Sequence, residues 1–183
     1  EVNDGQWFEI KTAACFLPMH AAVPDAARAQ RLMDHLTDPG EFWTALPVPT
    51  VAADEATYSD DMWRGPVWMP MNFLLVQALA SYAAFLGDTF QVSDPTGAAE
   101  KVPLRDVVDD LARRLSGLLV RGDDGRRPVL GANDYFQTDP HWRDLVPFSE
   151  YFDGDTGRGV GASHQTGWTA LVAVLLQYRG RVR

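Results

Sequence analysis

The sequence predicts an all-α protein, and two observations lead to that prediction. Helical segments alternate along the chain between segments that are apolar on nearly every side and segments that are amphipathic. No stretch shows convincing strand alternation closed by hairpin turns, although residues 126–137 have room for a short one. An apolar helix must be surrounded by protein, so the alternation indicates an inner and an outer layer. An α/α toroid fits these layers, and so does an α-solenoid, although no fixed-period repeat is visible.

Five helical segments carry this prediction, in the following order. Apolar segments lie near residues 6–22, 66–86 and 166–180. Between them lie two amphipathic segments, one near 24–37 and one that follows Pro103. In the second, apolar residues recur at the spacing of one helix face: Leu104, Val107, Val108, Leu111, Leu115, Leu118 and Leu119. A simple four-helix bundle is excluded, because its helices would all be amphipathic.

Composition and charge exclude several classes of function. The chain has 183 residues, of which 46% are hydrophobic and 22% charged, so it is expected to form one globular domain with a core. Its net charge of −9 argues against nucleic acid or an anionic membrane surface as a partner. Residues 65–87 are uncharged and long enough to span a membrane, but their prolines and polar residues favour a buried helix.

No cofactor and no metal are predicted. Cys15 is the single cysteine, and the histidines show no zinc-ligand spacing. The glycine-rich residues 154–161 lack the lysine and the glycine spacing of phosphate-binding loops. Residues 153–157 begin like a calcium loop, but Gly157 and His164 stand where ligands belong.

The residues suited to chemistry lie in the segments before the apolar helices. In a toroid the inner helices point their N-termini to the same end, so residues 5–9, 58–72 and 148–168 are expected to meet at one mouth. Aromatic rings and polar groups at a shared rim suit a sugar, because rings stack on the apolar faces of pyranoses while polar groups hold hydroxyls. Glu150, among neighbouring aromatic residues, would be partly desolvated and held, as a general base needs.

Each of these residues also has a structural interpretation. Glu150 could be a solvated carboxylate paired with Arg143 or Arg158. Trp63 and Trp68 could both be core residues, with the intervening arginine stacked on one of them.

Two motifs in this order resemble a known family. The segments "WRGPVW" (63–68) and "EYFDGDTGRGVGASHQTGW" (150–168) resemble the C-terminal half of the catalytic domain of family-63-type glycoside hydrolases. Those enzymes are inverting α-glycosidases with an (α/α)₆ toroid. "AACFLPMHAA" (13–22) and "PTVAADEATYSDDMWRGP" (49–66) support the resemblance, which covers nearly the whole chain. Within the family, "SHQTGW" (163–168) is most similar to the mannosylglycerate and glucosylglycerate hydrolases.

The resemblance implies a role for each site residue. Glu150 matches the general base, which activates the attacking water. Trp63, Arg64 and Trp68 match the wall of the sugar subsite, and Gln165 matches a glutamine that reaches the glycerate part of the substrate. The same motif adds two further substrate-binding residues, His164 and Trp168.

The resemblance also implies that residues 1–183 are the C-terminal part of a single catalytic domain. An inverting glycosidase needs a second carboxylic acid, which in this family is an aspartate in an upstream Trp-Asp motif, and this chain contains no Trp-Asp dipeptide. About five helices are expected where the family's toroid has twelve, so the N-terminal half of the toroid is the expected partner. The absence of cysteine pairs and the glycerate-type motif favour the cytoplasm.

The predicted function is therefore inverting hydrolysis of a small α-glucoside or α-mannoside, such as glucosylglycerate or mannosylglycerate. The sequence leaves the choice of sugar, the aglycone and the oligomeric state open. The alternatives are a non-catalytic helical carbohydrate-binding module and a helical protein-interaction domain.

Overall fold

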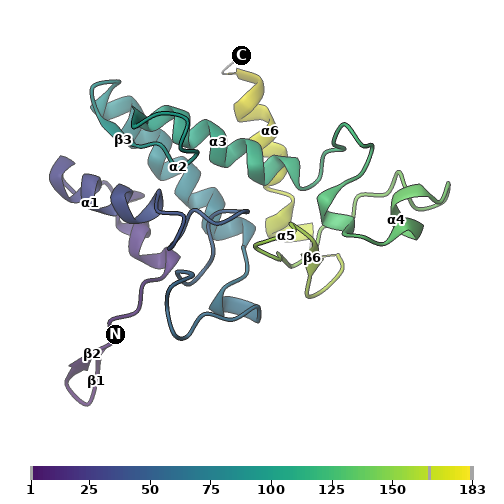
Figure 1. The fold of residues 1–183 in the computed structure, drawn as a ribbon, viewed down its shortest axis with the longest axis horizontal. Coiled ribbons are helices and arrows are strands. Elements are labelled where there is room, and N and C mark those ends of the chain that lie inside the picture. The colour runs from purple at the N-terminus through teal and green to yellow at the C-terminus, as the bar shows by residue number, and fades with distance from the viewer. Residues whose placement is uncertain (1, 165, 182–183) are drawn as a thin grey trace.

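The computed structural model describes residues 2–164 and 166–181, and helices dominate it (Figure 1). The α-helices are α1 (Ala26–Leu36), α2 (Met69–Leu86), α3 (Leu104–Gly117), α4 (Asp134–Thr138), α5 (Thr166–Thr169) and α6 (Val172–Arg181). Three 3₁₀ helices accompany them: η1 (Ala13–Met19), η2 (Met62–Arg64) and η3 (Pro128–Leu130). Three short antiparallel hairpins complete the described elements: β1 (Val2–Asn3) with β2 (Gln6–Trp7), β3 (Gln91–Ser93) with β4 (Lys101–Pro103), and β5 (Tyr151–Phe152) with β6 (Gly159–Val160).

The core lies where the long helices pack together. Helix α3 contacts α2 on one side and α6 on the other, and α2 also contacts η1. The predicted apolar face of α3 is the buried one, including Leu104, Val108, Leu111 and Leu115. Helix α1 begins at Ala26, two residues after the start of the predicted segment, because the Asp25 side chain accepts a hydrogen bond from the backbone N–H of Arg28 and caps the first turn.

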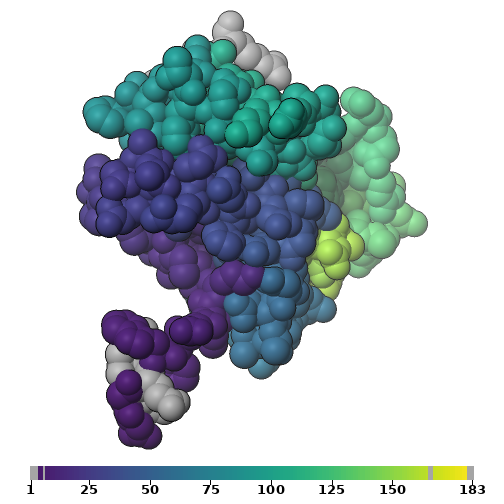
Figure 2. Space-filling model, turned by 60° about the vertical axis from the view of Figure 1, so that its left-hand side comes forward, coloured from purple at the N-terminus to yellow at the C-terminus, as the bar shows by residue number. Residues whose placement is uncertain are grey.

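The predicted helix over residues 6–22 is wrong for most of its length. Strand β2 and the 3₁₀ helix η1 form there, and the backbone of residues 11–13 bonds to a distant segment. The Ala13 N–H donates to the Thr50 carbonyl at 2.9 Å, and the Ala52 N–H donates to the Lys11 carbonyl at 3.0 Å. The N-terminal hairpin β1–β2 projects from the body of the molecule (Figures 1 and 2), and Trp7 on it is 76% exposed.

Two further predictions need correction. Residues 126–137 hold η3 and α4 and no hairpin, while the hairpins that do form were not predicted. The predicted helix over 166–180 is divided into α5 and α6. Strands this short offer two or three residues of alternation, which is too little for a sequence pattern to detect.

The apolar helices are not enclosed on every side by the described part of the chain. Helix α2 buries Leu75, Val76 and Leu79, but Phe85 at its end is 85% exposed. On α6, Leu175 is buried whereas Val174 is 45% exposed. Helix α2 has the length and apolar composition of a membrane-crossing helix, and in this fold it packs against α3 and η1.

Candidate active site

The two motifs singled out in the sequence lie against each other, although they are far apart along the chain. The Val67 N–H donates to the Phe152 carbonyl at 2.8 Å, and the Phe152 N–H donates to the Val67 carbonyl at 2.9 Å. This bridge attaches strand β5 of the glycine-rich hairpin to the segment that leads into α2. The backbone therefore fixes Glu150, at the start of β5, relative to the tryptophans that flank Val67.

Aromatic rings from both motifs form a continuous stack. The Trp63 and Trp68 rings are parallel within 16°, with centroids 3.7 Å apart, and Tyr151 stacks on Trp68 at 4.9 Å. Trp168 lies tilted against Trp68 at 5.7 Å. Trp68 is 1% exposed, since its neighbours cover it, whereas Trp63 is 47% exposed. Of the two tryptophans predicted to line the sugar subsite, Trp63 is the one with ring surface open to a ligand, and Trp68 supports it.

Glu150 is half-buried and fixed by three hydrogen bonds. Its backbone N–H donates to the Ala162 carbonyl, and the Trp168 indole N–H donates to its carbonyl at 2.8 Å. The Ala162 N–H donates to the carboxylate Oε2 at 2.9 Å. No ion pair joins Glu150 to Arg143, Arg158 or any other residue within 2–164 and 166–181, so the ion-pair interpretation does not apply there. The carboxylate is held by the backbone, with Oε2 directed at a peptide N–H.

The glycines of the hairpin are required by close contacts. At Gly161, with φ of +70°, an added Cβ would lie 2.6 Å from both the Glu150 Oε2 and the Tyr151 Cε1. At Gly159, an added Cβ would lie 1.9 Å from the Ser149 Oγ. Side chains at these positions would displace the carboxylate or the strand that carries it. Sequence analysis missed this role, because glycine content signals a bent loop without saying what approaches it.

The turn between β5 and β6 is ordered by Asp153. Its Oδ1 accepts hydrogen bonds from the Thr156 N–H and hydroxyl and from the Asp155 N–H, at 2.8 to 3.1 Å. Burial alone would raise the pKa of the Asp153 carboxyl, but these hydrogen bonds and the charge of Arg158 outweigh it and lower that pKa. Asp153, the first residue of the segment that resembles the start of a calcium loop, thus orders the turn of this hairpin.

The remaining predicted site residues lie in three different situations. Arg64 pairs with Asp61 at 2.9 Å on the surface, and no stacking of its guanidinium on a tryptophan is seen in the described residues. The His164 Nδ1 accepts a hydrogen bond from the Phe148 N–H at 3.3 Å, and the two rings are stacked. Gln165 lies outside the described residues. Among the described residues, no group of three or more metal-ligating side chains is found.

Known proteins resemble this chain at the level of family, sequence and structure. The family model described as "Mannosylglycerate hydrolase MGH1-like glycoside hydrolase domain" matches residues 1–169. An uncharacterised protein of Saccharomyces cerevisiae is 48% identical over 113 residues, which are 61% of this chain and 10% of that protein. A mannosylglycerate hydrolase of Thermus thermophilus is 28% identical over 108 residues, which are 58% of this chain and 26% of that protein. A probable mannosyl-oligosaccharide glucosidase of Schizosaccharomyces pombe is 23% identical over 164 residues, 87% of this chain and 17% of that protein.

Solved structures of low sequence identity share the fold. The GH63 mannosylglycerate hydrolase of Thermus thermophilus in complex with glucose matches with a TM-score of 0.58 at 21% identity, over 94% of this chain and 32% of that chain. The same enzyme in complex with Tris and D-glycerate matches with a TM-score of 0.59 at 21% identity, over 92% of this chain and 30% of that chain. The chain thus spans about a third of these structures and 10% to 26% of the three relatives named above.

Proposed function

We propose a glycosidase function for this chain, which belongs to the mannosylglycerate hydrolase MGH1-like glycoside hydrolase domain family. In this proposal, residues 1–183 form the C-terminal part of a single (α/α)₆ catalytic domain in the cytoplasm. The enzyme hydrolyses a small α-glucoside or α-mannoside, such as glucosylglycerate or mannosylglycerate, with inversion. The observation that carries the proposal is the Val67–Phe152 bridge, which joins the backbone-held Glu150 carboxylate to the aromatic stack.

Each residue then has a chemical task. The Glu150 carboxylate takes a proton from water, whose oxygen attacks the anomeric carbon from the face opposite the leaving group. Its bond to the Ala162 N–H fixes the direction of the carboxylate, which lowers the cost of reaching the attack geometry. The exposed ring of Trp63 receives the apolar face of the sugar.

The second half of the reaction needs a carboxylic acid outside residues 1–183. That acid protonates the glycosidic oxygen as its bond to the anomeric carbon breaks. Inverting enzymes hold the two carboxyl groups roughly 6.5–9.5 Å apart, so that the water fits between base and sugar. We propose an upstream aspartate for this role. Polar contacts to the substrate from Arg64, His164, Gln165 and Trp168 remain part of the proposal.

The test is hydrolysis by the full-length gene product, comparing wild type with Glu150→Gln. The amide keeps an oxygen that accepts from the Ala162 N–H but cannot take a proton from water. We expect turnover of α-glucosylglycerate and α-mannosylglycerate to fall by about 10²–10⁴-fold, the usual contribution of a general base. Glu100→Gln, an exposed glutamate beside β4, is the matched control and should keep wild-type turnover.

Anomer-resolved NMR of the first product separates the mechanisms. A β-anomer supports inversion, and an α-anomer contradicts it. Unchanged turnover in Glu150→Gln removes this residue from the mechanism. If the wild type binds sugars but hydrolyses no α-glucoside or α-mannoside, the chain belongs to a binding module instead.

A further inference from the structure

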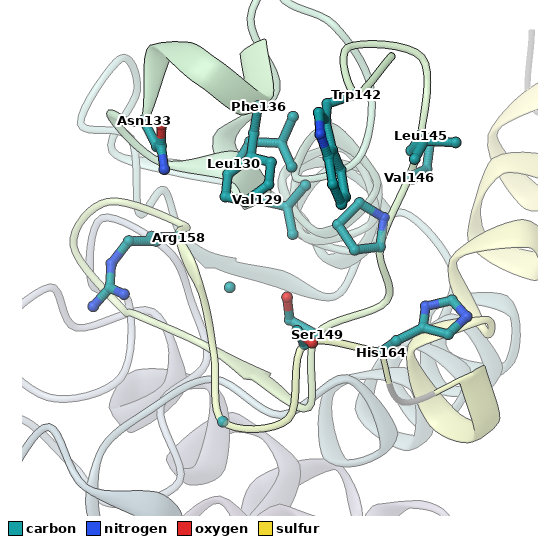
Figure 3. A pocket seen from close by; sticks show the side chains of 14 residues that line it. Val129, Leu130, Asn133, Phe136, Trp142, Leu145, Val146, Ser149, Arg158 and His164 are labelled. Carbon is teal, nitrogen blue, oxygen red and sulfur yellow. The ribbon is translucent and has the colours of Figure 1, made fainter. Parts of the chain in front are cut away.

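A hollow lies beside the hairpin β5–β6, which follows Glu150, and its two sides differ in polarity (Figure 3). Its volume is about 710 Å³, within the range of pockets that hold small molecules. One side comes from residues 129–147 and is apolar, with Phe136 and Trp142 as its rings. The other side comes from the hairpin and the segment after it, and presents Ser149, Ser163 and His164. None of the lining residues is an aspartate or a glutamate, although the chain as a whole is acidic.

The apolar side is built in advance of any ligand. Gln137 is buried, and its amide donates to the carbonyls of Arg127 and Gly131 and accepts from the Arg127 N–H, all at 2.9 to 3.0 Å. These bonds tie α4 to the segment around η3. The indole N–H of Trp142 donates to the Tyr135 hydroxyl at 3.0 Å, which fixes the ring, and Trp142 stays 41% exposed.

The hollow is separate from the aromatic stack but adjoins the general base. Among the described residues proposed for the active site, Glu150, Trp63, Trp68 and Trp168 do not line it, whereas His164 lies at its edge and is shared by the two proposals. Gly161 lines the hollow and also lies next to the Glu150 carboxylate, since a Cβ built on Gly161 would be 2.6 Å from the Glu150 Oε2. A ligand in the hollow would therefore lie against the hairpin from the side that the stack does not occupy.

We propose that this hollow is an accessory saccharide site, which binds a pyranose ring other than the one hydrolysed. A pyranose has an apolar C–H face, which suits the indole and aliphatic side, and a rim of hydroxyls, which suits the serine hydroxyls and the imidazole. In Figure 3 the Arg158 guanidinium points away from the apolar side chains, so the proposal assigns the hydroxyl contacts to Ser149, Ser163 and His164. The site does not depend on the hydrolase activity.

The probe is methyl α-glucopyranoside or methyl α-mannopyranoside, titrated into the ¹⁵N-labelled full-length gene product. The indole resonance of Trp142 is identified as the one lost in Trp142→Phe. We expect that resonance to shift saturably, and Trp142→Ala to weaken this binding about tenfold or more. Trp142→Phe keeps a ring at the position and should retain most of the affinity, which guards against a loss caused by misfolding. Val23→Ala, at an exposed position before α1, is the control and should bind as wild type.

The outcomes decide between this site, the proposed active site and an apolar pocket. A Trp142 shift that survives Trp63→Ala supports a separate site, even if the protein hydrolyses no glycoside. A shift abolished equally by Trp63→Ala means one site and overturns the proposal. A Trp142 resonance that neither sugar shifts also overturns the proposal. If benzyl alcohol shifts it and neither sugar does, the hollow is an apolar pocket and not a saccharide site.

Discussion

Gly161, which lies against the proposed general base Glu150, must be a glycine for a conformational and a steric reason. Its φ of +70° is costly for any residue with a side chain, and an added Cβ would meet the Glu150 Oε2 at 2.6 Å. Gly161→Ala is therefore expected to lower kcat by at least tenfold and to destabilise the protein by about 1–2 kcal/mol. Kinetics and thermal denaturation of the full-length gene product check both. Gly180→Ala, with open space around the added Cβ in α6, should leave kcat unchanged; equal behaviour of the two variants would contradict the contact.

Asp153 makes the hairpin sensitive to acid. Hydrogen bonds hold its folded-state pKa below the usual value of 3.8, so the ionised form stabilises the fold above that value. The stabilisation is lost as pH falls below about 4 and through the lowered pKa. Asp153→Asn cannot ionise, so its melting temperature should lie below wild type at pH 7 and converge with it at the acidic end. A constant difference across that range would show that the charge of Asp153 does not stabilise the turn.

At the scale of elements, one buried side chain attaches a loop to the start of α2. The Asn72 amide accepts from the Val48 N–H at 2.8 Å and donates to the carbonyls of Val48 and Trp68. Asn72→Ala leaves buried backbone groups unsatisfied, so we expect a loss of about 2–4 kcal/mol in the free energy of unfolding. Gln77→Ala, exposed on the same helix, should change it by less than about 0.5 kcal/mol. Urea denaturation measures both, and a loss below about 1 kcal/mol in Asn72→Ala would mean that water replaces the amide.

At the scale of the whole molecule, the apolar surface of α2 and α6 bears on the proposal of a larger toroid. Phe85 is 85% exposed and Val174 is 45% exposed, on helices whose sequences are typical of inner layers. The 183-residue chain prepared alone is therefore expected to self-associate with rising concentration and to show no glycosidase turnover, since the proposed general acid lies outside it. Light scattering and the glycosylglycerate assay check this. Phe85→Ser should reduce the association, whereas a monodisperse, active chain would contradict the partial-toroid proposal.

Local patterns account for the parts of the fold that the sequence predicted well. The apolar spacing of α3 acts within a few helical turns, so it can be read without knowing the rest of the chain. The family was likewise recognisable, because its two motifs are contiguous segments, and the family match over residues 1–169 confirms it.

Contacts between distant segments decided the rest. Residues 6–22 are apolar enough for a helix, but the backbone of residues 11–13 bonds to residues 50–52 instead. Trp63 and Trp68 belong to the same motif, but Trp68 is stacked with both Trp63 and Tyr151 and is buried, whereas Trp63 is 47% exposed. The apolar side of the hollow comes from residues 129–147, where Gln137 bonds to the Arg127 carbonyl, and no sequence pattern indicated either feature. Neighbouring residues determine the local preference for a helix or a turn. The burial of a side chain depends on residues distant in the sequence, which only the folded chain brings together.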